Sequence, residues 1–139
     1  MIEYIENNLD VDTYLKLREE VNWRKLTKEQ AEKGLKNSLY ILTAYEDRRA
    51  VGMGRIVGDG AIVCYVQDLI VVPDKQRDGI GGVILEGLKQ FVEKEGIPGT
   101  RMMFDLMCAK GREKFYKKHH FIARPTEKLG PGMIQYLDL

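Results

Sequence analysis

A glycine-rich segment in the middle of the chain, Gln76 to Gly82, constrains the fold more than any other feature of the sequence. It follows the mostly apolar run 68–72, which Pro73 ends, and it precedes residues 83–92, where apolar side chains recur every three or four positions as on the buried face of a helix. The order is therefore strand, tight turn, helix. Glycines let the backbone turn sharply, and the first N–H groups of the helix have no intrahelical acceptor. Together with the helix dipole, these donors predict a binding site for a phosphate or diphosphate group.

Two well-known phosphate-binding motifs do not fit this segment. A Walker P-loop ends in Gly-Lys-Ser/Thr, whereas Gly82 is followed by Val83 and Ile84. A dinucleotide-binding fingerprint requires its third glycine at position 84, where this chain has isoleucine. The pattern that remains is Gln-x-x-Gly-x-Gly between a strand and a helix, with an ordinary glycine-rich turn as the alternative interpretation.

Length and charge limit the class of protein. The 139 residues suit one domain spanning 1–139, and 22 Lys and Arg against 21 Asp and Glu give no sign of a nucleic-acid or membrane surface. Cys64 and Cys108 are expected to be buried free thiols, which suits a reducing cytoplasm. Glu3 and Glu6 interrupt the first residues, so we expect no signal peptide, and no apolar run is long enough to span a bilayer. The expected location is cytoplasmic.

Hydrophobic periodicity and turn residues predict an α/β fold. We expect a mixed, mostly antiparallel twisted sheet of about six to seven strands, flanked by about four helices. The expected strands are 1–5, 40–45, 50–57, 61–72 and 101–108, with one or two closing strands within 121–139. The expected helices cover about 11–21, 28–37, 83–96 and 111–118, the first two capped by Asp10 and Thr27.

The Gln-x-x-Gly-x-Gly pattern, after a strand that ends in Val-Val-Pro, resembles the diphosphate-binding loop of the GNAT superfamily of acetyl-CoA-dependent N-acetyltransferases. A second motif, Phe115 to Phe121, resembles the "Phe-Tyr-x-x-x-Gly-Phe" of the same family, and the order of elements matches its layout over essentially the whole chain. One departure is His120, which stands where relatives usually have glycine. That glycine commonly takes a backbone conformation that a side chain disfavours, although histidine tolerates it better than most residues.

The resemblance implies an enzyme, an acyltransferase that moves the acetyl group of acetyl-CoA to a primary amine by direct attack in a ternary complex. Acetyl-CoA is then the co-substrate, and no metal is expected, since His119 and His120 have no third ligand at metal spacing. Alignment on the motifs assigns the cofactor to a strand segment and a loop. The implied cofactor-binding residues are Leu69, Ile70, Val71, Gln76, Arg77, Asp78, Gly79, Ile80, Gly81 and Gly82.

The resemblance also assigns proton donation to Tyr116, which matches the family tyrosine near the coenzyme sulfur; packing beside Phe115 is the alternative interpretation. For the base that deprotonates the amine, Asp68 is the candidate, because it is the only acid in the strand that leads to the loop. Asp105, an acid in an apolar strand, and a chain of water molecules are the alternatives.

The acceptor is expected beside the connector between the first two helices. There Asn22 and Trp23 border the acceptor groove in relatives, although Trp23 could equally pin the helices to the sheet. The acceptor amine, on a small molecule or a peptide, is not identified by the sequence, which also does not decide between a monomer and a homodimer. A non-catalytic acyl-CoA-binding sensor domain is the alternative function.

Overall fold

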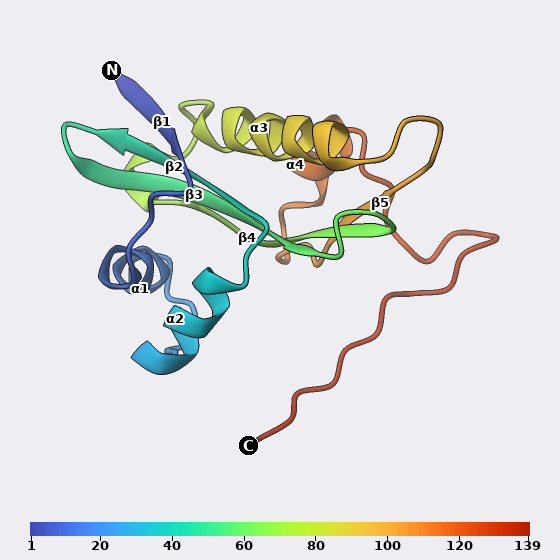
Figure 1. The fold of residues 1–139 in the computed structure, drawn as a ribbon, viewed down its shortest axis with the longest axis horizontal. Helices are drawn as coiled ribbons and strands as arrows, with labels where there is room; N and C mark the ends of the chain where they lie inside the picture. The colour runs from blue at the N-terminus through green and yellow to red at the C-terminus, as the bar shows by residue number, and fades with distance from the viewer. The chain divides into compact units, whose positions relative to one another are not determined.

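Five strands form a single sheet in the computed structural model, which describes residues 1–139, in the order β1-β2-β3-β4-β5 (Figure 1). The strands are β1 (Ile2–Glu6), β2 (Tyr40–Glu46), β3 (Arg49–Gly58), β4 (Val63–Val71) and β5 (Met103–Leu106). The first four pair antiparallel, and β5 pairs parallel to β4. Two compact units make up the chain, residues 1–106, which hold the whole sheet, and residues 107–139.

Turn chemistry explains the antiparallel hairpins. Asp47 and Arg48, between β2 and β3, both have positive φ angles of 48° and 69°, as in the two-residue turns that match strand twist. Between β3 and β4, one carboxylate oxygen of Asp59 accepts hydrogen bonds from the N–H groups of residues 61, 62 and 63 at 2.8–3.0 Å. The parallel pairing of β5 requires a crossover, and helix α3 supplies it.

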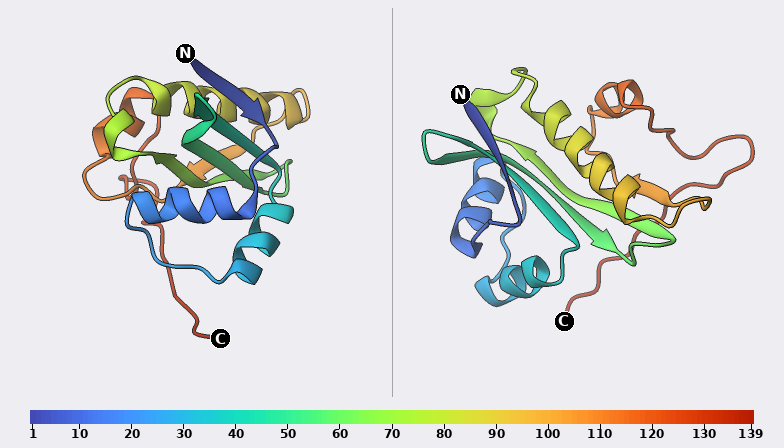
Figure 2. Two further views of the ribbon diagram at one scale, coloured as in Figure 1. Left: turned by 90° about the vertical axis from the view of Figure 1, so that its left-hand side faces the viewer. Right: turned by 45° about the horizontal axis from the view of Figure 1, so that its top comes forward.

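Helices cover both faces of the sheet in the first unit (Figure 2). On one face lie α1 (Val11–Glu20) and α2 (Lys28–Lys36), and on the other lies α3 (Ile80–Glu95). The expected caps are confirmed: Asp10 accepts from Thr13 N at 2.8 Å, and Thr27 accepts from Gln30 N at 3.0 Å. Each cap satisfies a donor that the helix itself cannot pair.

Helix α3 approaches the sheet closely because glycines face it from β3. A Cβ atom at Gly54 would lie 2.6 Å from Ile84 Cγ2 and 2.8 Å from Leu88 Cδ1. At Gly52 it would lie 3.1 Å from Ile84 Cδ1 and 3.3 Å from Ile80 Cγ2. Such distances leave no room for a methyl group, so these glycines set the depth at which α3 packs against the strands.

The expected fold class is confirmed, but the strand count is lower than six to seven. In the second unit, α4 (Glu113–Lys118) is the only regular element, and the closing strands expected within 121–139 are absent. Pro125 and Pro131 lack the N–H group that a ladder requires, and a turn closed by Thr126 N and Leu129 O, at 2.8 Å, occupies the segment between them.

Both cysteines are free, as expected, but only Cys64 is buried. Cys108 is exposed because β5 ends at Leu106, two residues earlier than the sequence indicated. No helix in the chain combines the length and apolar character that crossing a bilayer requires.

Candidate cofactor and active site

The loop between β4 and α3 has the geometry that the glycine pattern predicts. A single turn of 3₁₀ helix, η1 (Pro73–Lys75), follows β4, and α3 begins at Ile80. Between them, Arg77 and Gly79 take left-handed conformations with φ angles of 75° and 83°. Open space surrounds the Gly79 Cα, because a Cβ there would have no heavy atom within 4 Å. Glycine at this position therefore serves the backbone conformation rather than close packing.

The amino end of α3 is left without a cap. Its N-cap residue, Gly79, has no side-chain cap hydrogen bond, and its first turn contains no acid. The first intrahelical bond runs from Val83 N to Gly79 O at 3.2 Å, so the amides of Ile80, Gly81 and Gly82 have no intrahelical acceptor. These donors and the helix dipole fit an anionic group such as a diphosphate.

Side-chain contacts hold the loop against β4 and the β2–β3 turn. Gln76, the first residue of the motif, donates from Nε2 to the carbonyl oxygen of Val71 at 2.9 Å. The guanidinium of Arg49 binds both oxygens of Asp74 at 2.9 Å, and Lys75 pairs with Glu46 at 2.7 Å. The sequence did not predict either ion pair, because the partners are 25 residues (Arg49 and Asp74) and 29 residues (Glu46 and Lys75) apart along the chain.

Strands β4 and β5 separate before β4 reaches the loop. The ladder with β3 continues to Val71, whereas the ladder with β5 ends at Val66 and Leu106. Residues 67–71 therefore have a strand partner on one side only. Successive peptide groups of a strand point to opposite sides. Val72 N bonds to the Val51 carbonyl of β3 at 2.9 Å, which places the peptide groups of Leu69 and Val71 on the side away from β3.

This alternation refines the expectation for the strand segment. Leu69 can offer its main-chain N–H and carbonyl groups to an extended ligand, as an added strand would. Val71 can offer its N–H group, because its carbonyl oxygen already accepts from Gln76. Ile70 directs its peptide groups toward β3, and its side chain is buried. Ile70 is therefore suited to support the segment rather than to bind by its main chain.

A β-bulge marks the point where β4 leaves β5. Arg55 pairs with Asp68 and Ile56 pairs with Val66, so Gln67 is the extra residue on β4. Gln67 is exposed although both of its neighbours are buried. A bulge bends its strand and redirects side chains, and such features occur often next to active sites. The pattern of apolar and polar residues along β4 does not predict this bulge.

Asp68 lies in a buried ionic cluster beneath α1. Its carboxylate accepts hydrogen bonds from Tyr14 Oη at 2.6 Å and from Arg55 Nε at 2.7 Å, and Arg18 Nη1 lies 3.5 Å from its second oxygen. Only 1 % of Asp68 is exposed. Arg55 also donates to Gly34 O at 3.1 Å, so the cluster joins α1, α2, β3 and β4.

The cluster perturbs the groups around the carboxylate. Burial, together with the negative charge of Asp68, raises the pKa of the Tyr14 phenol. Burial alone would lower the pKa of the Arg55 guanidinium, but the neighbouring carboxylate raises it. A carboxylate held by two short hydrogen bonds and two arginines is well suited to fix the packing of α1 on the sheet. Its role as a base stays a prediction.

Arg18 connects this cluster to the segment between α1 and α2. Its guanidinium carbon lies 5.3 Å from the centroid of the Trp23 ring, within the range of a cation–π contact, and its Nη2 donates to the Arg24 carbonyl at 3.0 Å. Asn22 has a left-handed φ of 59°. The two predicted acceptor residues thus lie in a connector that Arg18 holds, and their contact with an acceptor stays a prediction.

Tyr116 lies in the second unit, on α4. The helix ends in a Schellman motif: His120 N bonds to Lys117 O at 3.0 Å, and Phe121 N bonds to Tyr116 O at 3.1 Å. His120 has a φ of 72°, the left-handed conformation for which glycine is favoured at this position. The rings of Tyr116 and Phe121 meet edge to face at 5.8 Å, the apolar contact that accompanies the motif. The spacing Tyr-x-x-x-(Gly/His)-Phe thus orients the tyrosine.

The pKa of Tyr116 is raised to about 12, mainly because partial burial of the phenol disfavours its charged form. The phenol is therefore protonated at neutral pH and can donate a hydrogen bond.

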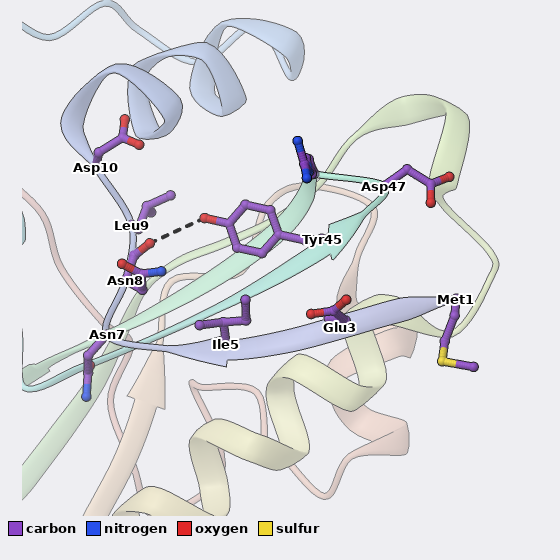
Figure 3. Close-up of a pocket in the computed structure, with 10 residues that line it drawn as sticks. Met1, Glu3, Ile5, Asn7, Asn8, Leu9, Asp10, Tyr45 and Asp47 are labelled. Atoms are coloured by element: carbon purple, nitrogen blue, oxygen red, sulfur yellow. Dashed lines mark hydrogen bonds between the residues drawn. The ribbon is translucent and has the colours of Figure 1, made fainter.

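A cavity of about 700 Å³ lies at the β1 side of the sheet, which is the edge opposite β5 (Figure 3). Tyr45 borders it and donates from its hydroxyl to Asn8 O at 3.3 Å. Its lining shares no residue with the loop or with the divergence of β4 and β5. The lining residues are Met1, Glu3, Ile5, Asn7, Asn8, Leu9, Asp10, Tyr45, Asp47 and Arg48.

Comparisons with known proteins agree with this geometry. Residues 11–134 match the model of the acetyltransferase (GNAT) domain family. An uncharacterized N-acetyltransferase, ycf52 of Pyropia yezoensis, is 27 % identical over 128 residues, which cover 88 % of this chain and 71 % of the relative.

Two solved structures are similar over nearly their whole length. A probable acetyltransferase of unknown function from meticillin-resistant Staphylococcus aureus has a TM-score of 0.85 and 31 % identity, and the match covers 98 % of this chain and 100 % of the relative. A GNAT-family acetyltransferase from Streptococcus pneumoniae has a TM-score of 0.83 and 30 % identity, with 99 % and 98 % covered.

Proposed function

Because the chain belongs to the GNAT family of acetyltransferases and is an acyltransferase, we propose that it moves the acetyl group of acetyl-CoA to a primary amine. The transfer proceeds by direct attack of the amine in a ternary complex. The uncapped amino end of α3, directly behind a strand with a free edge, is the observation that carries this proposal. Acetyl-CoA supplies an activated acyl group on a good leaving thiol.

The residues present fit the parts of this co-substrate. Residues 76–79 form the turn that leads into α3, and the amides of Ile80, Gly81 and Gly82 would donate hydrogen bonds to the diphosphate. Leu69 and Val71 would pair with the amide-containing arm, with Ile70 behind them. These contacts come mostly from the main chain, so the side chains at these positions carry little of the recognition.

Proton transfer is assigned to side chains that the sequence singled out. Tyr116 would donate to the sulfur as negative charge develops there, and its high pKa keeps it in the protonated form that this role requires. Asp68 is the sequence-based candidate for the base. Its buried contacts support a second role as well, the positioning of α1 and, through Arg18, of Asn22 and Trp23 beside the acceptor.

The acceptor is an amine of a small molecule or a peptide, and residues 1–139 would make up one N-acetyltransferase domain. The two free cysteines support a cytoplasmic location.

The experiment that tests the proposal has two stages. Acetyl-CoA should raise the melting temperature of the protein, and coenzyme release should then be measured across a panel of amines with wild type and Tyr116→Phe. We expect thiol release with at least one amine, unchanged acetyl-CoA binding in the variant, and a slower rate. Binding without release by any amine would instead favour a sensor, and no thermal shift at all would refute both functions.

A further inference from the structure

An acid on β5 lies beside the point where the two parallel strands separate. Asp105 is paired in register with Tyr65 of β4, and the next pair, Val66 with Leu106, is the last of the ladder. Asp105 is therefore one residue away from the divergence that leaves residues 67–71 of β4 without a β5 partner.

The carboxylate of Asp105 has one oxygen without a hydrogen-bond partner. Its Oδ1 atom is buried and has no hydrogen-bond partner, and it forms no ion pair. Burial raises the pKa of this carboxyl group. Asp68 Oδ1 also lacks a hydrogen bond, but Arg18 lies 3.5 Å from it, and Asp68 Oδ2 accepts from Tyr14 and Arg55 at less than 2.8 Å. Buried polar atoms without partners are uncommon in folded proteins, and a catalytic role is one of the explanations for them.

The register places Asp105 on the face of the sheet that α1 covers. Residues paired across strands project to the same face, so Val57, Tyr65 and Asp105 share one face. Arg55 lies two residues before Val57 on β3 and therefore projects to this face too. Its guanidinium contacts Tyr14 of α1, which identifies the face as that of α1. The connector with Asn22 and Trp23 follows α1.

The position along β4 also fits the reacting end of the co-substrate, and this step rests on the proposed function. The diphosphate site follows the carboxyl end of β4, and the N–H group of Val71 and then the peptide groups of Leu69 run back from it toward the bulge at Gln67. An arm that follows these groups leads its far end to the place where β4 and β5 join, next to Asp105.

We propose that Asp105 is the catalytic base that takes a proton from the ammonium group of the acceptor. The freed electron pair of the nitrogen forms the new C–N bond to the acyl carbon, and the C–S bond breaks. The nitrogen loses a second proton as it becomes an amide, and the departing sulfur takes up a proton and leaves as the thiol. Asp105 then returns its proton to solvent, so the step requires no oxidant or other co-reactant.

The test compares Asp105→Asn with Asp68→Asn, two changes that each remove one negative charge at nearly constant shape. Thermal unfolding, acetyl-CoA affinity, and kcat and KM for an amine that wild type accepts are measured for each. Asp105→Asn should unfold at or above the wild-type temperature, since an unpaired buried charge is removed, and should bind acetyl-CoA normally. Its kcat should fall by roughly 10²- to 10⁴-fold. Asp68→Asn should lower the melting temperature, because it leaves Arg55 without its partner.

A pH profile adds a second readout. In wild type, kcat/KM should decline on the acid side as the base becomes protonated, and this limb should vanish in Asp105→Asn and return in Asp105→Glu. The other titratable groups nearest to Asp105 on β4 are the Cys64 thiol, whose pKa is raised by burial, and Tyr65.

Three outcomes decide the matter. An Asp105→Asn enzyme that keeps its rate within about threefold and its acid limb overturns the inference while leaving the proposed function intact. A loss of kcat and of the acid limb in Asp68→Asn alone also overturns it. A wild type that binds acetyl-CoA yet acetylates no amine refutes the proposed function, and the inference with it.

Discussion

A charge placed at the amino end of α3 should weaken coenzyme binding without harming the fold. Gly79 is the position of choice, because it is exposed, has a φ of 83°, and has no heavy atom within 4 Å of where a Cβ would be. Aspartate and asparagine have nearly the same shape, and both tolerate the left-handed conformation better than other side chains. Gly79→Asp and Gly79→Asn therefore differ mainly in one negative charge.

The size of the effect follows from Coulomb's law. At about 6 Å from a unit charge of a diphosphate, the repulsion is about 0.7 kcal/mol with the dielectric constant of water and about 2.8 kcal/mol with the value typical of a protein surface. The exposed loop lies between these limits. We therefore expect Gly79→Asp to bind acetyl-CoA roughly 5- to 50-fold more weakly than Gly79→Asn in moderate salt. In 1 M salt the difference should largely disappear, because the Debye length falls to about 3 Å.

Isothermal titration with acetyl-CoA measures this difference, and acetyl-pantetheine, which lacks the diphosphate, is the matched control ligand. The two variants should bind acetyl-pantetheine equally, and their melting temperatures without ligand should agree closely. Equal acetyl-CoA affinities in low salt would refute the placement of the diphosphate at α3. An equal loss for both ligands in Gly79→Asp would show that the charge disturbs the loop itself.

Three further predictions concern the fold and the tyrosines. His120 has a left-handed φ angle, so His120→Gly should stabilise the protein by about 1 kcal/mol and raise its melting temperature by roughly 2–6 °C. His120→Ala should not stabilise it. Equal melting temperatures of the two variants would contradict the Schellman geometry. Asp68→Asn should lower the free energy of unfolding, measured with a chemical denaturant, by about 3–5 kcal/mol. Asp68→Leu combined with Arg55→Met should recover part of that loss. A loss below about 1 kcal/mol in Asp68→Asn would contradict a stabilising role of the buried ion pair. The pKa values of Tyr40 and Tyr116 are about 12, above the ordinary value of 10.0, because the fold favours the neutral phenols. Their contribution to the free energy of unfolding is therefore complete below pH 10 and is lost between about pH 10 and 12. Unfolding followed across that range should show stability falling as pH rises, and a flat profile would contradict the burial of both phenols.

Local sequence patterns correctly predicted the elements whose structure depends on residues close together in the chain. The caps at Asp10 and Thr27, the glycine turn before α3 and the strands up to β4 follow from short-range chemistry, and the structure confirms them. The family resemblance added the tyrosine motif, and the left-handed His120 explains why relatives have glycine there.

Features that depend on partners distant in sequence could not be predicted. Nothing near Asp68 in the chain indicates that Tyr14 and Arg55 will surround it. The bulge at Gln67 depends on the register between β3 and β4, which alternation within one strand does not fix. The segment 121–139 contains apolar residues that a strand could use, but a strand also needs a neighbour with which to pair, and the sequence does not identify one.

The central claim, that the free amides at the start of α3 bind the diphosphate, is tested most directly by following backbone amide signals in a nuclear magnetic resonance titration with coenzyme A. We predict that the signals of Ile80, Gly81 and Gly82 move most and saturate together with the measured affinity. Signals that stay fixed there while those around the β1 cavity, such as Glu3 and Tyr45, move would contradict the account.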